Sequence, residues 1–522
     1  MHSHDILAMA AAIVPERDAT VFDGARQTYA ELAARANRLA NALAGLGVGP
    51  GDRVAVVDVN TPAHLEVYFA VARLRAIYVP MNFRGRGAEL VYPLEVAAPK
   101  VLFAGERYVS RIDSLPLALQ ESAFVAFARS GDDSEENGWS AYEALLAGGD
   151  QEELRFPEGD DDATAALLFT AGTTGNPKAV PLSHSSFTSF MLSSIEPADP
   201  DAEECTLLTL PMYHIAGLQS ALAGVYGGRT LVVQRQFEAQ EWMELVQRER
   251  VQRALLVPTM LKQIIDHPDF PCHDLSSLAV LTYGGAPMPF TVVERAIEAL
   301  PGVQFINAFG QTETGSTIAM VPPEDHVLEG PTDVLATRRK HLASIGVALP
   351  DVEVRIVDED GREVGAGEPG EIIARGPRLM RGYWGDDAAS ASTIRKGWLY
   401  TGDLGHMDED GYIYLGGRAK DFIKRGGEMV SPEEVESVLY AHPGVEECAV
   451  IGLPDETWGE RVVAVVVPKA GEGAATEDAL LEVVQERLAR FKRPEQVVFV
   501  DALPRNDLGK VLKRELRERL GG

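Results

Sequence analysis

A stretch of nine residues, Thr170–Lys178 (TAGTTGNPK), has the residue types of a phosphate-binding loop. Its glycines let the backbone turn and bring N–H groups close to an anion, its threonines add hydroxyl donors, and Lys178 adds a positive charge. It differs from the Walker pattern, because Lys178 follows a proline and Ala179 takes the place of the Ser/Thr magnesium ligand. The same composition is also typical of an ordinary turn, so the stretch alone leaves both interpretations open.

Three later segments carry side chains that suit other parts of a nucleotide. Gly284–Pro287 begins with a glycine pair that lets a flat ligand approach the backbone, although a simple turn explains it equally well. In Asn307–Glu313, the asparagine suits a base edge, the threonine a phosphate oxygen, and Glu313 a hard cation such as Mg²⁺. Asp403, in Tyr400–Asp403, suits a ribose diol. Each also has a plainer interpretation as a turn glycine or a solvated acid.

The elements that must hold these residues alternate between strand and helix over the first 350 residues. Thr28–Glu31 has the form of a capping box at a helix start, and apolar runs such as Val54–Val57 and Leu278–Tyr283 indicate buried strands. This alternation predicts a large domain of layered α/β sheets, largely parallel. From about residue 350, alternating apolar and polar residues with Asp-Gly turns predict an antiparallel β-rich part over 350–417.

A second, smaller domain is predicted from residue 418 onward. Ser431–Glu434 indicates a capped helix, and two strands, another helix and a last strand follow, which is enough for an α+β domain of ordinary size. The break falls at Gly416–Arg418, where two glycines favour a hinge. We therefore expect domains at 1–417 and 418–522.

Composition excludes several classes of partner. The chain has 522 residues and a net charge of -30, which argues against nucleic-acid and anionic-membrane partners. Cys205, Cys272 and Cys448 are isolated and lack metal-ligand spacing, which predicts a reduced, cytoplasmic protein. The apolar run Ile6–Val14 is too short to span a bilayer and no Lys or Arg precedes it, so we expect neither a signal peptide nor a membrane helix.

Taken in order, the segments TAGTTGNPK, GGAP, NAFGQTE, YTGD, GRAKDFIKRGGE and PRNDLGK resemble the motifs of the adenylate-forming (AMP-binding) superfamily. Its members include acyl-CoA synthetases, firefly luciferase and the adenylation domains of peptide synthetases, and the SPEEVE and GEPGEI segments resemble the acyl-CoA synthetases in particular. The resemblance covers nearly the whole chain. It implies a large N-terminal domain with a small mobile lid, and a ligase that uses ATP to turn a carboxylic acid into acyl-AMP and then transfers the acyl group to coenzyme A.

The resemblance also implies a role for each motif. Thr170–Lys178 would hold the β- and γ-phosphates of ATP, and Asp403 and Arg418 would bind its ribose. Lys510 would bridge the substrate carboxylate and the α-phosphate, and Glu313 would bind Mg²⁺. The implied catalytic residues are Lys510, Thr312, Glu313 and Lys178, and the implied nucleotide-binding residues are Thr170, Gly172, Thr173, Thr174, Gly175, Lys178, Gly285, Ala286, Asn307, Ala308, Phe309, Thr312, Asp403, Arg418 and Lys510.

Three positions call for separate interpretation. Ala171 replaces the usual serine and Phe309 the usual tyrosine, and each change removes a hydroxyl without touching Lys510 or Glu313. Lys513 lies in a basic helical run, and we interpret it as a solvated charge rather than a catalytic one.

The second step implies a moving lid, because CoA must reach the acyl-adenylate where Lys510 stood. Lys420, two residues after Arg418, occupies the family's hinge position. The face presented for thioester formation would comprise Lys424, Arg425, Gly426 and Gly427.

The acid itself is less well defined. Tyr213 and His214 resemble the entrance of the acyl pocket, where Gly284, Gly310 and Gly315 would leave room, although a structural histidine explains His214 equally well. No cation stands out there, which favours a medium- or long-chain fatty acid or an aromatic monocarboxylate. Two alternatives remain open: an acyl-AMP ligase that loads the phosphopantetheine of a carrier protein, and a non-catalytic nucleotide-binding regulator. The sequence leaves the oligomeric state open, a homodimer included.

Overall fold

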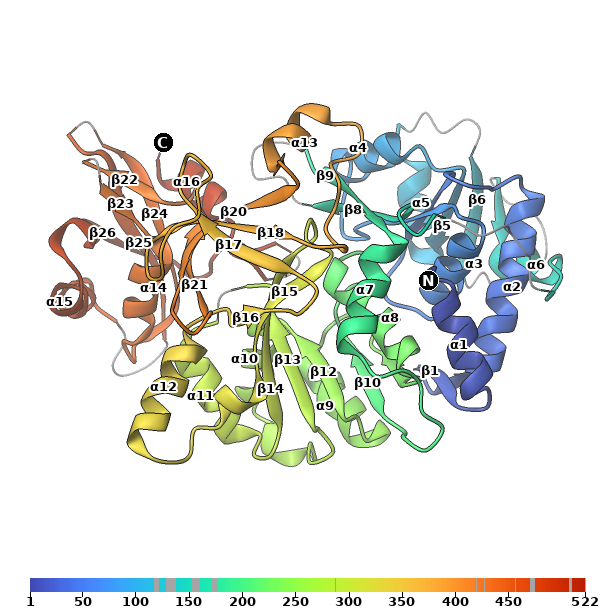
Figure 1. Cartoon of the computed structure of the whole chain (residues 1–522), viewed down its shortest axis with the longest axis horizontal. Coiled ribbons are helices and arrows are strands. Elements are labelled where there is room, and N and C mark those ends of the chain that lie inside the picture. The colour runs from blue at the N-terminus through green and yellow to red at the C-terminus, as the bar shows by residue number, and fades with distance from the viewer. Residues whose placement is uncertain are drawn as a thin grey trace.

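The structure is a computed structural model that describes residues 1–116, 122–127, 138–152, 160–170, 176–286, 288–418, 420–426, 428–455, 457–469, 475–506 and 509–521. Its described strands form four sheets. Figure 1 shows the N-terminal part in blue at one end of the molecule and the C-terminal part in red at the other. Among the described helices, none combines the length and the apolar character needed to cross a bilayer.

The first large sheet has the strand order β7-β6-β5-β3-β4-β8-β9. It is parallel except for β9, which pairs antiparallel with β8. The central strands are buried on both faces, as the continuous apolar run Val54–Val57 requires. Its strands are β3 (Arg53–Val57), β4 (Ile77–Pro80), β5 (Val101–Gly105), β6 (Ala123–Phe127), β7 (Trp139–Ala141), β8 (Thr164–Thr170) and β9 (Lys178–Ser183).

The second large sheet has the order β16-β15-β14-β13-β12-β10-β11-β1-β2. Its central strands are parallel, and β2, β15 and β16 add antiparallel edges. Its strands are β1 (Asp18–Phe22), β2 (Ala25–Thr28), β10 (Cys205–Leu208), β11 (Thr230–Val233), β12 (Arg253–Leu256), β13 (Val280–Gly284), β14 (Gln304–Gln311), β15 (Ser316–Val321) and β16 (Val347–Ala348).

Helices connect these strands, as the sequence predicts. The capping box is confirmed: Thr28 Oγ1 accepts from Glu31 N at 3.2 Å, and Thr28 N donates to Glu31 Oε2 at 2.8 Å. The helices are α1 (Asp5–Ile13), α2 (Tyr29–Gly45), α3 (Ala63–Arg73), α4 (Ala88–Ala97), α5 (Glu106–Asp113), α6 (Tyr142–Ala147), α7 (His184–Ser194), α8 (Ile215–Tyr226), α9 (Ala239–Glu249), α10 (Pro258–Ile265), α11 (Phe290–Ala299), α12 (Thr332–Leu342) and α13 (Asp387–Thr393).

The β-rich part after residue 350 is also confirmed. All its strand pairs are antiparallel, and the hairpin between β20 and β21 turns at Asp408–Tyr412. Its strands are β17 (Glu353–Val357), β18 (Gly370–Arg375), β19 (Ile394–Arg395), β20 (Trp398–Met407) and β21 (Ile413–Arg418).

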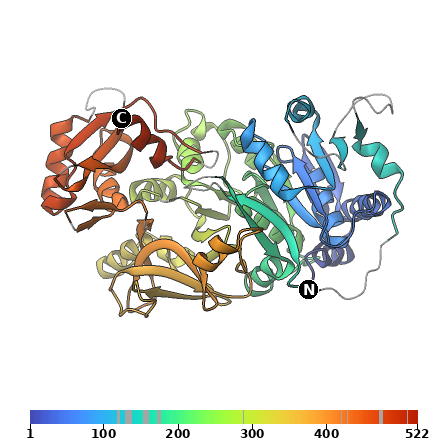
Figure 2. The ribbon, with the colours of Figure 1, turned by 90° about the horizontal axis from the view of Figure 1, so that it is seen from above.

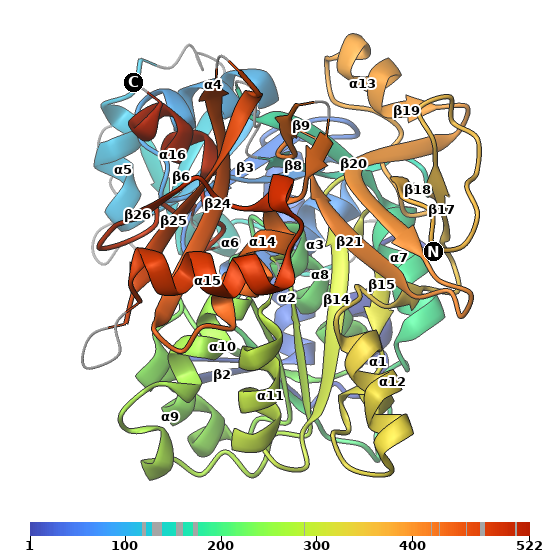
Figure 3. The ribbon, with the colours of Figure 1, turned by 90° about the vertical axis from the view of Figure 1, so that its left-hand side faces the viewer.

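The C-terminal part has its own sheet and its own core, in which Ile423, Val435, Val450 and Leu480 are buried together. Figure 2 shows it as a separate unit at one end of the molecule, and in Figure 3 it lies in front of the larger N-terminal part. A large domain of layered sheets with a smaller α+β domain is therefore the observed architecture. Its elements are β22 (Ile423–Arg425), β23 (Glu428–Val430), α14 (Pro432–Tyr440), β24 (Val445–Asp455), β25 (Gly459–Pro468), α15 (Glu477–Arg487), β26 (Gln496–Phe499) and α16 (Lys513–Leu520).

Two expected loops are partly strand. Residues Asn307–Gln311 belong to β14. They pair with β13 as far as Ala308, and all five of them pair with β15. Lys178 begins β9, so the 170–178 stretch links two antiparallel strands and the helix start at Ser183 comes one strand later. Residues 171–175, which include Gly172, Thr173, Thr174 and Gly175, lie outside the described residues.

Candidate active site

Asp403 is the centre of a buried polar group that joins three strands. It faces Arg418 across the β20–β21 pair, and Arg418 Nε lies 2.7 Å from Asp403 Oδ1. Gln311, at the end of β14, donates from Nε2 to Asp403 Oδ2 at 2.6 Å. Gln311 and Arg418 also donate to the Thr401 carbonyl, at 3.1 and 3.0 Å. Burial raises the pKa of Asp403, and the charge of Arg418 opposes that rise.

Lys510 is held by a short loop of the C-terminal part that lies against α10. Asn506 fixes the loop at both ends: Asn506 N donates to the Lys510 carbonyl at 2.9 Å, and Lys510 N donates to Asn506 Oδ1 at 2.8 Å. Gly509 has a φ of +75°, and a Cβ there would lie 2.5 Å from Thr259 Oγ1 of α10. The C-terminal loop therefore reaches the N-terminal part through a contact that only a glycine allows.

Arg418 pairs with Asp403, and two lysines lie close enough to be affected by both charges. The Lys510 side chain reaches solvent, although protein atoms surround much of it. This partial burial and the charge of Arg418 lower the pKa of Lys510, while the charges of Asp403 and Asp421 raise it. Burial and the Arg418 charge also lower the pKa of Lys420, to about 8, and Lys510 contributes in the same direction. The structure thus brings Arg418, Lys420 and Lys510 together, and their mutual repulsion favours an anionic ligand.

Lys178 and Glu313 form a second centre, and Tyr383 links them. The Lys178 ammonium lies 4.4 Å from the centre of the Tyr383 ring, and the Tyr383 hydroxyl donates to Glu313 Oε1 at 3.1 Å. Thr170 pairs with Lys178 in register and donates from Oγ1 to its carbonyl at 3.4 Å. Thr312 begins the turn after β14, where its carbonyl accepts from Gly315 N at 3.1 Å.

Glu313 fits the requirements of a Mg²⁺ ligand. One carboxylate oxygen is oriented by Tyr383, which leaves the other for a hard cation. The described residues contain no group of three His, Cys, Asp or Glu side chains that could hold a metal. A magnesium ion at Glu313 would therefore take most of its ligands from phosphate and water, as Mg²⁺ commonly does.

The residues expected around adenine lie side by side at the ends of β13 and β14. Tyr283 pairs with Asn307 and Gly284 with Ala308, and Gly285 and Ala286 follow where this pairing ends. A Cβ on Gly284 would lie 2.1 Å from the Ala308 carbonyl, which explains the first glycine. Gly285 has a φ of +80°, which favours glycine there.

The expected acyl-pocket residues have packing roles. A Cβ on Gly310 would meet the Ser316 carbonyl at 1.9 Å, and one on Gly315 would meet the Arg378 carbonyl at 2.4 Å. These glycines allow close backbone contacts, whether or not they also line a pocket. Tyr213 is buried edge-on against Phe83, with ring centres 5.5 Å apart, and His214 precedes α8 with its ring 4.3 Å from that of Tyr213.

The face expected to serve CoA is the β22–β23 hairpin. Arg425 is occupied within its own domain, where it donates to the Phe491 and Arg493 carbonyls at 3.0 and 3.1 Å. Lys424 is exposed, and Gly426 lies beneath the exposed ring of Trp458. Gly427 lies outside the described residues.

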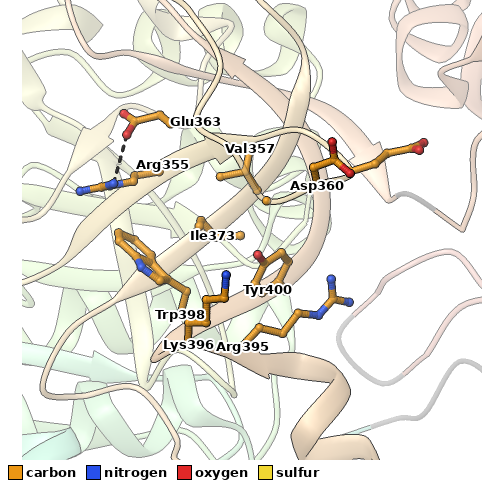
Figure 4. A pocket seen from close by; sticks show the side chains of 11 residues that line it. Arg355, Val357, Asp360, Glu363, Ile373, Arg395, Lys396, Trp398 and Tyr400 are labelled. Atoms are coloured by element: carbon orange, nitrogen blue, oxygen red, sulfur yellow. Dashed lines mark ion pairs between the residues drawn. The ribbon is translucent and has the colours of Figure 1, made fainter.

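A cavity of about 270 Å³ lies elsewhere, on the β-rich part (Figure 4). Arg355 at its edge pairs with Glu363 at 3.1 Å and lies over the Trp398 ring. Since its floor is Val357 and Ile373 of the β17–β18 pair, it is separate from the Asp403 and Glu313 centres.

Two residues of the site were not predicted from the sequence. Gln311 shares one face of β14 with Asn307 and Phe309, a period-two signal that the sequence contains once 307–311 is recognised as a strand. Tyr383 comes from a loop far from both of its partners in the chain, and no spacing points to it.

Comparison with known proteins identifies the family of this chain. The AMP-binding enzyme family matches residues 7–384, and the AMP-binding enzyme C-terminal domain matches residues 434–510. The chain belongs to the AMP-binding enzyme family, in its acyl-CoA ligase branch.

Individual relatives are similar over nearly their full lengths. Indoleacetate–CoA ligase of Aromatoleum aromaticum is 37% identical over 511 residues, 97% of this chain and 96% of that protein. The fatty acid–acyl-carrier-protein ligase ScoC of Streptomyces coeruleorubidus is 34% identical over 515 residues, 97% of this chain and 94% of that protein. The crystal structure of ATP-bound MatB from Rhodopseudomonas palustris superposes with a TM-score of 0.86 at 30% identity, covering 99% of both chains.

Proposed function

We propose that this chain is an AMP-forming acyl-CoA synthetase that converts a carboxylic acid and ATP into acyl-AMP and pyrophosphate, then acyl-AMP and CoA into acyl-CoA and AMP. The observation that carries the proposal is the buried Asp403–Arg418 pair, with Gln311 donating to Asp403 and with Lys420 and Lys510 close enough to be affected by its charge. A carboxylate that can accept from the ribose hydroxyls, with nearby cations that can donate to a phosphate, matches the ribose and phosphate of AMP.

In the first step, attack of the carboxylate on ATP brings two anions together, and charge builds on the α-phosphate oxygens. Lys510 would neutralise that charge, with Thr312 donating to the same phosphate and Lys178 holding the leaving pyrophosphate. Asp403 and Arg418 would hold the ribose. Mg²⁺, when bound at Glu313, would supply further stabilisation of the phosphate charge.

For the second step, we place the domain boundary between 417 and 418, with 418–522 as a lid that turns about Lys420. A hinge close to this position is supported by the strand assignment, because β22 begins a separate sheet at Ile423. Arg418 itself is the last residue of β21 and still pairs with β20, so it stays on the side of the larger domain. Lys420→Pro should preserve adenylation and block thioester formation, and equal loss of both steps would contradict a hinge at this position.

The acid we propose is a monocarboxylate, aromatic or fatty. The experiment is a panel of acids with ATP and CoA in which AMP and thioester are both measured. A second candidate, transfer to a carrier protein's phosphopantetheine, is favoured by the similarity to ScoC. Comparing free CoA with a holo-carrier as acceptor separates the two, and absence of acid-dependent ATP–pyrophosphate exchange would instead support a non-catalytic regulator.

Location and assembly remain predictions. Cys205, Cys272 and Cys448 are free thiols, which suits the reducing cytoplasm that we propose. The oligomeric state stays open, with a homodimer as one alternative.

A further inference from the structure

Tyr383 contacts both charged groups at the phosphate end of the site. Its hydroxyl donates to Glu313 Oε1 at 3.1 Å, and its ring face carries the Lys178 ammonium at 4.4 Å from the ring centre. A carboxylate is therefore held at the edge of one aromatic ring and an ammonium over its face. The hydrogen bond stabilises the carboxylate and the ring stabilises the ammonium, and neither charge is cancelled, because the phenol is uncharged.

The loop that carries Tyr383 is fastened on both sides. Trp384 N donates to the Ala179 carbonyl at 2.9 Å, next to Lys178 in β9. Met380 N donates to the Glu313 carbonyl, also at 2.9 Å. Since β9 belongs to the first large sheet and Glu313 follows β14 of the second, Tyr383 has a fixed place between the two sheets.

A tyrosine that contacts both a lysine and a carboxylate also occurs elsewhere in the structure, but there the lysine and the carboxylate form an ion pair. Tyr414 donates to Asp408 at 3.2 Å and carries Lys340 over its ring at 5.7 Å, but Lys340 and Asp408 also pair directly at 2.7 Å. Within the described residues, Lys178 and Glu313 form no ion pair with each other or with other groups. Tyr383 therefore keeps apart two opposite charges that would pair and cancel if they met.

We propose that Tyr383 is the positioning residue that keeps Lys178 and Glu313 separate, charged and oriented for magnesium-bound ATP. The inference rests on the proposed function of the site. Tyr383 acts in two separable ways: its hydroxyl orients the carboxylate for the metal, and its ring holds the ammonium for the phosphates.

Because the hydroxyl and the ring of Tyr383 have different roles, two substitutions of Tyr383 should have different effects. Tyr383→Phe keeps the ring and loses the hydroxyl that donates to the metal ligand. The Mg²⁺ concentration at half-saturation should therefore rise about tenfold, as it does when other residues that orient a metal ligand are replaced. The KM for ATP at saturating Mg²⁺ should change less than about twofold. Tyr383→Leu also loses the ring, so the KM for ATP should rise by about 2- to 30-fold, the range of a cation–π contact.

A double-mutant cycle tests whether the ring acts through Lys178. In a Lys178→Met background, Tyr383→Leu should raise the KM for ATP no more than Tyr383→Phe does, because no ammonium remains to be held. Tyr414→Phe and Tyr414→Leu are matched controls for the loss of a hydroxyl and of a ring, and should leave both constants unchanged.

Calorimetric titration of Mg²⁺-dependent ATP binding, without acid or CoA, supplies the readout that does not depend on turnover. Weaker binding in Tyr383→Phe at low Mg²⁺, restored at high Mg²⁺, supports the proposal. Unchanged Mg²⁺ dependence in Tyr383→Phe, or a ring effect that persists without Lys178, would overturn it. Failure of the wild-type protein to bind Mg²⁺ and ATP would instead refute the proposed function itself.

Discussion

Replacing Lys510 with methionine removes one charge and leaves its loop in place. The loop is held by the backbone of Lys510 through Asn506, not by the Lys510 side chain. Loss of one positioned donor from a developing oxyanion typically lowers the rate about 10²- to 10³-fold, or about 2.7–4 kcal/mol of barrier. Because the ammonium lies near Arg418 in the absence of ligand, its removal also relieves repulsion, so we expect no loss of thermal stability.

The assay separates the two half-reactions. Acid-dependent ATP–pyrophosphate exchange should fall about 10²- to 10³-fold, while thioester formation from supplied acyl-AMP and CoA should remain close to wild type. Lys469→Met, which removes an exposed lysine of the same domain, is the matched control. Unimpaired exchange, or equal loss of both half-reactions, would refute the role assigned to Lys510.

Three further outcomes follow from the same contacts. Burial lowers the pKa of Lys420 in the folded state to about 8, below its usual value, so the charge on Lys420 destabilises the fold at pH 7. This destabilisation fades as pH rises from about 8 to 10.4, because the lysine then loses its charge in the folded state. Lys420→Met should therefore raise the thermal midpoint at pH 7, and this increase should disappear by about pH 10. Gln311→Met removes the hydrogen bond that Gln311 donates to Asp403 Oδ2. A hydrogen bond to a charged group contributes about 1.5–3 kcal/mol, so the KM for ATP in exchange assays should rise about 10- to 100-fold. Lys262 of α10 pairs with Glu446 of β24, so Glu446→Lys should slow exchange about two- to fivefold without affecting the thioester step, and Lys262→Glu in addition should restore it.

The arrangement of elements could largely be predicted from the sequence, because it depends on local patterns. The apolar run at Val54–Val57 indicates a buried strand wherever it occurs, and the Ser431 cap fixes the start of α14, where Ser431 Oγ accepts from Glu434 N at 3.2 Å. The order of the motifs then places Asp403, Arg418 and Lys510 in one site, and the structure brings these three together.

What the sequence could not show depends on partners distant in the chain. Lys513, interpreted as a solvated charge, is instead largely buried, 2.8 Å from Glu436, and the interpretation was wrong because its acidic partners lie on α14. Tyr383 has no signal in its own segment, since its role exists only once β9 and the turn after β14 lie on either side of it.

The cation cluster also gives the proposed lid a reason to move. In a chain with a net charge of -30, burial and then the charge of Arg418 lower the pKa of Lys420 and of Lys510, and Asp403 only partly offsets this. In the proposed cycle, bound ATP would relieve that repulsion and favour the position in which Lys510 lies near Asp403. When pyrophosphate leaves, much of the compensating negative charge would leave with it, and the repulsion would return. Because Arg418 pairs with β20 of the larger domain and Lys510 lies in the C-terminal part, the returning repulsion would act across the proposed hinge, in the direction that opens the site to CoA.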